Sequence, residues 1–154
     1  DAQLGRTGAL DEKVAAEANW NYVTQQTADW DEATARTITQ SVIDSGKPFN
    51  VIYAENNGMA RGAVAALDAA GITHGKGGDV IVMGFDSDKW AFEAVLEGSW
   101  NYMGLCNPLQ ADTVDSIIKD LMAGKAPAQK IIYTPEQGFD CDTLTQADVD
   151  TYGT

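Results

Sequence analysis

Residues 49–71 read FNVIYAENNGMARGAVAALDAAG, and this stretch decides the fold. The apolar run at 49–54 predicts a strand that stops abruptly at Glu55. Apolar residues then recur at helical spacing from 58 to 70, and Gly71 is typical of the residue that ends a helix. A strand followed at once by a helix predicts one repeating unit of a layered α/β domain.

The remainder of the chain continues this alternation of strands and helices. Strands are predicted at 21–25, 49–54, 80–85, 100–106 and 130–133, and helices at 31–45, 58–70, 88–97 and 108–122. The unbroken apolar run at 80–85 is typical of a strand buried on both faces of a parallel sheet. Residues 1–5 look like the end of a strand, and the acidic tail from Asp140 has no strong pattern. We expect one three-layer α/β domain with a parallel sheet.

The composition limits the classes of function. Hydrophobic residues make up 44% of the 154 residues, which is enough for a core. Lys and Arg total 10 against 23 Asp and Glu, a net charge of −13. A field of this sign repels phosphate backbones and anionic lipid, so nucleic acid is not an expected partner. Neutral or cationic small ligands remain possible.

Three side chains follow successive predicted strands, and they suggest a binding site. Trp30 follows the first strand, Asn56 the second and Asp86 the third. Because the carboxyl ends of parallel strands meet at one edge of a sheet, we expect them to converge. A carboxylate accepts hydrogen bonds from neighbouring hydroxyls, an amide donates and accepts, and a flat aromatic ring packs on the C–H face of a sugar. The pattern therefore favours a polyol ligand.

Structural roles for the same residues remain open. Asn56 or Asn57 could cap the helix that follows, and Asp86 could do the same for the next helix. Trp30 could be a core residue. Only the joint occurrence of the three at equivalent strand ends favours binding over these alternatives.

Enzymatic signals are weak throughout the sequence. His74 lies in a glycine-rich loop without an evident partner, and no phosphate-binding loop or G-x-S-x-G motif is present. We expect no catalytic residue, no metal site and no cofactor. Cys106 and Cys141 could form one disulfide or remain two small thiols.

Several motifs, taken in order, resemble a known family. VIYAENNGMARGAVAALDAAG (51–71), DVIVMGFDSD (79–88) and GLCNP (104–108) resemble the type I periplasmic sugar-binding proteins, the solute receptors of ABC importers. LGRTGALDEK (4–13) and TADWDEATA (27–35) fit the same family. The resemblance implies two α/β lobes that close on a sugar like a hinge.

The resemblance also implies how this chain relates to such a receptor. Residues 1–154 would be the carboxyl-terminal lobe, cut just after one of its strands. The helix at 108–124 would belong to the amino-terminal lobe, so that here it would pack elsewhere or on a second copy, as a homodimer or domain swap. The implied partners are a monosaccharide-class ligand and the membrane permease of an ABC importer. The implied location is extracytoplasmic, as a periplasmic protein or a cell-surface lipoprotein.

The family's site residues carry over to five positions. Trp30 sits where the family has a stacking aromatic, and Asn56 and Asp86 sit where it has hydrogen-bonding residues. Cys106 falls at a crossover where many members have Gln. In the family, an Arg usually reaches the ligand from the helix after a turn that resembles GRTG (5–8) here, and Lys13 is the nearest match, although Lys lacks the planar fork of Arg.

The resemblance adds an expectation about the thiols and leaves two rival functions. The family's crossover segments run side by side, so Cys106 and Cys141 are expected to be close enough to bridge. One rival is the effector-binding lobe of a LacI-type transcriptional regulator, which has the same fold; the acidic charge favours the receptor. The other is a small flavodoxin-like enzyme, which would need a phosphate-binding loop after its first strand.

Overall fold

The computed structural model describes residues 2–127 and 129–154. The elements in chain order are α1 (Ala2–Ala16), α2 (Glu32–Asp44), β1 (Val51–Tyr53), α3 (Asn57–Ala70), β2 (Ile81–Asp86), α4 (Lys89–Leu96), β3 (Tyr102–Leu105), α5 (Ala111–Met122), β4 (Gly138–Asp140) and α6 (Gln146–Tyr152). Among the described residues, no helix is both long and apolar enough to cross a membrane.

The strands form one sheet in the order β1-β2-β3-β4. β1 pairs with β2 in parallel, with Val51 opposite Ile81, and β2 pairs with β3 in parallel, with Met83 opposite Tyr102. β4 runs antiparallel to β3. The predicted α/β fold with a largely parallel sheet is confirmed, and β4 is an antiparallel edge that the sequence did not predict.

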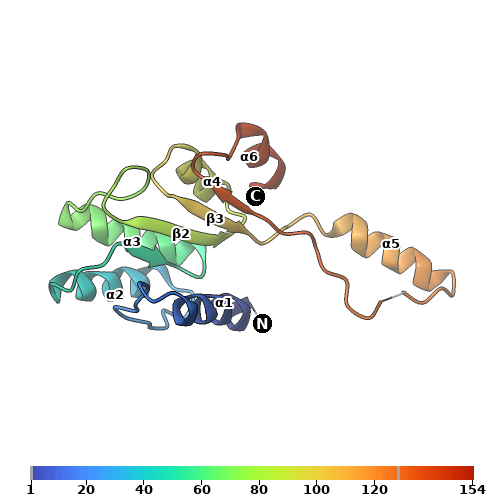
Figure 1. Cartoon of the computed structure of the whole chain (residues 1–154). Coiled ribbons are helices and arrows are strands. Elements are labelled where there is room, and N and C mark those ends of the chain that lie inside the picture. Colours follow the sequence, from blue (N-terminus) through green and yellow to red (C-terminus); the bar gives the residue numbers. More distant parts are fainter. Residues whose placement is uncertain (1, 128) are drawn as a thin grey trace.

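The core lies between one face of the sheet and the helices α3 and α4 (Figure 1). Its fully buried side chains come from helices and strands alike: Leu67, Val80, Val82, Phe92, Val95, Met103 and Val149. Along β2, Val82 and Gly84 face this core, whereas Ile81 on the other face is 43% exposed. The expectation that β2 is buried on both faces is therefore wrong, because α1 reaches that second face only near Phe85.

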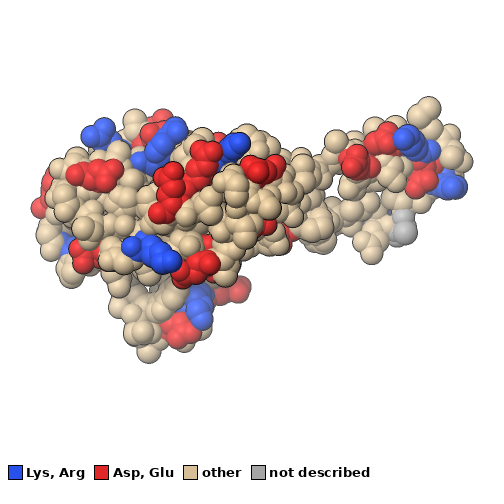
Figure 2. All heavy atoms as spheres, turned by 90° about the horizontal axis from the view of Figure 1, so that it is seen from above, with Lys and Arg blue, Asp and Glu red and all other residues tan. Residues whose placement is uncertain are grey.

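α5 stands apart from the rest of the molecule. Figure 1 shows it projecting from the body on two extended connections, and none of its residues is buried. On the face seen in Figure 2, acidic side chains are spread over both the body and this projection, with basic side chains between them. The net negative charge therefore does not gather into one patch on this face.

Three predicted segments differ from the structure. Residues 21–25 and 130–133 are not strands, and residues 2–5 belong to α1 and not to a strand end; Asp1 lies outside the described residues. A strand needs a hydrogen-bonded neighbour, and the sheet offers none to 21–25 among the described residues. Residues 130–133 run beside α5, away from the sheet, and Gly138–Asp140 pair with β3 in their place.

The expected bridge between Cys106 and Cys141 is also wrong, since both cysteines are free. Cys141 donates its N–H to the Asn101 oxygen, at the start of β3, whereas Cys106 follows the end of that strand. Five residues of strand separate the two positions, or roughly 16 Å. A disulfide requires Cα atoms within about 7 Å of each other.

Candidate functional site

The carboxyl ends of β1, β2 and β3 form one edge of the sheet, which we call the rim. Asn56 follows β1, Asp86 is the last residue of β2, and Cys106 follows β3. The Cys106 N–H donates to the backbone oxygen of Asp86 at 3.1 Å. Because the three strands are parallel, the structure brings together these three predicted site residues.

Asp86 lies at the centre of the rim in an unusual backbone conformation. Its φ is 116°, a region that residues other than glycine rarely adopt and that costs on the order of 1–3 kcal/mol. Burial raises the pKa of its carboxyl group above the usual value, and the charge and hydrogen bond of Arg6 oppose that rise. The ionised carboxylate is therefore costly here, and Arg6 compensates part of the cost.

Arg6 is the rim residue that the sequence analysis missed. Its Nη2 lies 3.0 Å from Asp86 Oδ1, and its side chain is only 14% exposed. The guanidinium group also donates to the backbone oxygen of Glu55 and lies 4.9 Å from the centre of the Phe85 ring, as a cation–π contact. The Tyr53 hydroxyl donates to the Arg6 backbone oxygen at 3.1 Å. The Arg6 guanidinium therefore joins α1 to the ends of β1 and β2.

Lys13, the basic residue expected at this place, has other partners. It lies two helical turns beyond Arg6, roughly 10 Å along α1. Its Nζ is 2.7 Å from Glu17 Oε1 and 5.9 Å from the centre of the Trp20 ring. The structure thus does not bring Lys13 to Asp86. The GRTG stretch is helical and not a turn, so the arginine inside it already faces the rim.

Asn56 combines a structural role with a free functional group. Its Oδ1 accepts the Met59 N–H at 2.7 Å, so Asn56 is the N-cap of α3, as the capping alternative predicted. The cap uses the amide oxygen, so the NH2 group can still donate a hydrogen bond to a ligand hydroxyl. Asn57, in contrast, is fully buried in the first turn and donates to Asp88 Oδ2 at 3.0 Å.

Trp30 is open to solvent just before α2. Its side chain is 46% exposed, so the alternative of a core residue is wrong. Both Asp29 and Trp30 have positive φ, at 50° and 63°, and Asp31 then caps α2 through the Thr34 N–H at 2.7 Å. Two successive left-handed residues turn the chain sharply before the helix. An exposed indole is what stacking on a sugar requires before the ligand arrives.

Cys106 presents a protonated thiol to the rim. Partial burial and the nearby carboxylates of Glu136 and Asp86 raise the pKa of this thiol, and Arg6 offsets only part of that rise. A thiol is a weak donor and a weak acceptor, so Cys106 offers much less to a hydroxyl than the amide that the family pattern places there. No group of three or more metal-binding side chains occurs among residues 2–127 and 129–154.

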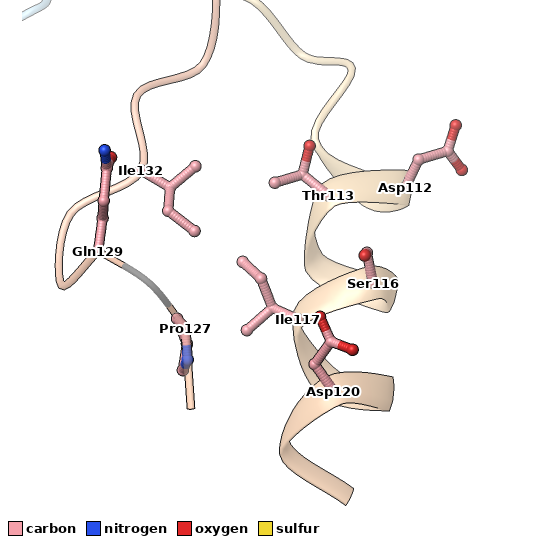
Figure 3. A pocket seen from close by; sticks show the side chains of 8 residues that line it. All are labelled: Asp112, Thr113, Ser116, Ile117, Asp120, Pro127, Gln129 and Ile132. Carbon is pink, nitrogen blue, oxygen red and sulfur yellow. The ribbon is translucent and has the colours of Figure 1, made fainter. Parts of the chain in front are cut away.

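A groove of about 540 Å³ lies far from the rim, between α5 and the returning chain. Figure 3 shows Ile117 of α5 and Ile132 of the returning segment pointing toward one another across it. The polar residues Thr113, Ser116 and Asp120 line the α5 side. This hollow belongs to the projection and not to the rim.

Comparison with known proteins gives one consistent result. Residues 2–126 match the family described as periplasmic binding protein domain. The fructose import binding protein FruE of Bifidobacterium longum is 31% identical over 137 residues, 88% of this chain and 40% of that protein. The ribose import binding protein RbsB of Bacillus subtilis is 26% identical, covering 78% of this chain and 37% of that protein.

Solved structures show the same fold. The periplasmic binding protein of the arabinose ABC transporter from Shewanella, bound to L-arabinofuranose, superposes with a TM-score of 0.84 at 23% identity, over 96% of this chain and 48% of that one. A Mycobacterium smegmatis protein in complex with β-D-fucofuranose gives a TM-score of 0.82 at 25% identity, with 96% and 47% covered. The chain therefore spans about half the length of these proteins. By the match over most of its residues, the chain belongs to the periplasmic binding protein family.

Proposed function

We propose that this chain is the carboxyl-terminal lobe of a monosaccharide-binding receptor of an ABC importer, extracytoplasmic and without catalytic activity. The observation that carries the proposal is the pair of Arg6 and Asp86 at the rim, with the Asn56 amide on the neighbouring strand end. The chain's relatives are named as import binding proteins for fructose, apiose and ribose, which supports a sugar as the class of ligand.

The rim has the chemistry that a small polyol needs. Asp86 uses Oδ1 for Arg6 and keeps acceptor positions on its carboxylate for ligand hydroxyls. Arg6 adds a fixed planar donor, since its stacking on Phe85 limits its rotation. Asn56 adds the amide donor, and Trp30 offers the flat apolar surface for the C–H face. Lys13 and Cys106 contribute less to such a site in this arrangement.

We further propose that a second lobe closes over the rim and takes up α5. Val114, Ile118 and Leu121 lie on α5 and are each at least half exposed, and Ile131 on the returning segment is 63% exposed. Large apolar side chains exposed along one side of a helix are typical of an interface. In the chain alone, the same surface could pair two copies as a homodimer or domain swap.

A titration by NMR tests the proposed ligand class. D-fructose, D-ribose and L-arabinose are added separately to the isotope-labelled chain, and shifts are expected for the Trp30 indole N–H and the Asn56 side-chain amide. Binding should be weak, because one lobe supplies only one wall of the pocket. Asp86→Ala and Trp30→Ala should abolish the shifts, whereas Ile81→Ala, at the opposite end of β2 from Asp86, should not. Undiminished calorimetric affinity of the same two alanine variants in a two-lobe protein would show that the assigned site is wrong.

A further inference from the structure

The loop that follows Asp86 is tied to the far end of the chain. The Thr154 N–H donates to the backbone oxygen of Ser87 at 2.9 Å, and the Lys89 N–H donates to the backbone oxygen of Thr154 at 3.1 Å. The hydroxyl groups of Thr154 and Ser87 lie 3.1 Å apart. Thr154 therefore pairs with Ser87 through its N–H and with Lys89 through its backbone oxygen, although 67 positions separate Ser87 from Thr154.

The fit between these two segments leaves no room for a larger residue. A Cβ atom at Gly153 would lie 2.6 Å from the Val149 oxygen and 3.1 Å from both Cα and Cβ of Lys89. Glycine is thus needed at position 153 because its neighbours leave no space for a side chain, and not because of its backbone angle φ. The end of α6 and the start of α4 are in direct backbone contact at this point.

α6 is a firm support for this contact. Thr145 and Asp148 form a capping box at its start, Val149 is fully buried, and the Tyr152 ring lies 5.8 Å from the Phe139 ring. Gly153 and Thr154 follow directly, so their positions are set by the core and not by the loop. The loop, in turn, has a second anchor on its other side.

That second anchor is Asn57. Its side chain is fully buried, and its Nδ2 donates to Asp88 Oδ2 at 3.0 Å. Its Oδ1 is buried without a hydrogen-bond partner among the described residues, which is a cost of about 1–3 kcal/mol. A buried amide kept at such a cost holds Asp88 in one place.

We propose that Gly153 and Thr154 form a strap that, together with Asn57, fixes residues 87–89 and so holds Asp86 in its strained backbone conformation at the rim. A residue with φ of 116° keeps that conformation only when its surroundings determine it. Arg6 holds the Asp86 side chain and the Cys106 N–H binds its backbone oxygen, whereas residues 87–89 that follow Asp86 are held by the strap and by Asn57. Thr154 and Gly153 are positioning residues that need not touch a ligand.

The consequence for ligand recognition rests on the proposed sugar-binding function, whereas the effect on Asp86 does not. The first measurements are therefore made without ligand. The Cys106 N–H is a suitable reporter, because it donates to the Asp86 backbone oxygen and touches neither Gly153 nor Thr154. The Val82 N–H, bonded to Asn101 Oδ1 at 2.9 Å, reports global opening of the body.

Deletion of Thr154 is the decisive variant, with Gly153→Ala as an independent one. Loss of the strap's hydrogen bonds should speed hydrogen exchange at the Cys106 N–H about tenfold and leave the Val82 N–H unchanged. The pKa of the Asp86 carboxyl, followed by NMR, should fall toward its usual value as the group becomes more hydrated. Thr154→Ala keeps both backbone bonds and should have a smaller effect, and Thr151→Ala, on the exposed side of α6, should have none.

The outcomes separate the two proposals. The strap proposal would be overturned if the deletion freed the Lys89 N–H for exchange but changed neither hydrogen exchange at the Cys106 N–H nor the pKa of Asp86. It would also be overturned if hydrogen exchange became faster by the same factor at the Cys106 and Val82 N–H groups, because that would indicate global opening. Titration with D-fructose and D-ribose follows: if the wild-type chain binds one of them, the deletion should weaken that affinity several-fold, and an undiminished affinity would overturn the positioning role. If neither sugar binds while the ligand-free effects appear, the strap is supported and the proposed ligand class fails.

Discussion

α3 and α5 are helices of similar length, but α3 is packed into the body and α5 is exposed. α3 buries six of its 14 residues against the sheet and α2, and its two ends are capped by Asn56 and Gly71. α5 has 12 residues, none of them buried, and no side-chain cap at its start. Of its apolar residues only Ile117 lines the groove of Figure 3, whereas Val114, Ile118 and Leu121, spaced for one side of a helix, are each at least half exposed. α5 thus carries a row of apolar side chains that no described residue buries.

The rim belongs to the first of these regions. Its side chains are held by contacts within the body, namely Arg6 with Asp86, Asn56 with Met59, and Asn57 with Asp88. We therefore propose that the body is a preorganised half-site and that the projection is a surface for assembly. If this contrast is right, substitutions in the two regions should have very different effects on the stability of the chain.

The largest effect is expected in the core of the body. Phe92 is fully buried and its ring lies 5.5 Å from the Phe139 ring, edge to face. Phe92→Ala should lower the free energy of unfolding by about 3–5 kcal/mol, because a cavity replaces a large apolar side chain. Urea unfolding followed by circular dichroism measures this loss. Met122→Ala on α5, where the side chain is 84% exposed, should change the free energy by less than about 0.5 kcal/mol.

The next effect concerns the attachment of α1, which has no buried residue of its own. Arg6→Ala leaves Asp86 half-buried without its ion-pair partner and should cost about 1–3 kcal/mol. It should also raise the pKa of Asp86 further, because the charge and hydrogen bond that oppose the effect of burial are lost. NMR titration gives the pKa and urea unfolding the stability, with Arg36→Ala on the exposed face of α2 as the control. No change in either quantity would mean that Arg6 does not hold α1.

The sequence predicts the rim better than it predicts the edges of the fold. Asn56 and Asp86 could be placed together because the carboxyl ends of adjacent parallel strands must share an edge, whatever the loops do, whereas Cys106 was placed only by the family resemblance and the strand predicted before Trp30 does not form. β1, α3, β2, α4 and β3 were predicted correctly, because their local apolar patterns agree with how these elements pack in the structure.

Arg6, the strap and β4 depend on contacts between distant residues, which a pattern cannot reveal. Arg6 reaches Asp86 across 80 positions, and it was hidden because the glycines of GRTG suggested a turn where the chain is helical. Thr154 pairs with the Ser87 loop from a tail without any periodic pattern. The failed strands at 21–25 and 130–133 had the right residues but no neighbour to pair with. Propensity states what a segment could form, and a pairing partner decides whether it does.

A smaller effect distinguishes two carboxylates of the body by the pH dependence of stability. Burial raises the pKa of Asp86 above its usual value near 3.8. The protonated Asp86 therefore adds to the free energy of unfolding below pH 3.8, and this stabilisation is lost as the pH rises through the raised pKa. Hydrogen bonds from Thr34 lower the pKa of Asp31 below 3.8. The ionised Asp31 therefore stabilises the fold above pH 3.8, and this stabilisation is lost as the pH falls through the lowered pKa. Asp86→Asn and Asp31→Asn should therefore change the pH profile of unfolding in opposite directions. Urea unfolding from about pH 3 to 7 measures both, and profiles of the same sign would refute the assignment.

The smallest effect on folding, and the most informative about assembly, is expected on α5. Ile118 is half exposed, and Ile118→Ser should leave the free energy of unfolding within about 0.5 kcal/mol of the wild type at low concentration. If α5 pairs two copies of the chain, sedimentation should show a concentration-dependent dimer that Ile118→Ser converts to monomer, because a hydroxyl would be buried without a partner. Lys119→Ser places the same side chain at the neighbouring polar position and should leave the dimer intact. A strongly destabilised Ile118→Ser monomer would contradict the contrast between α3 and α5, since it would mean that the projection already packs within its own chain.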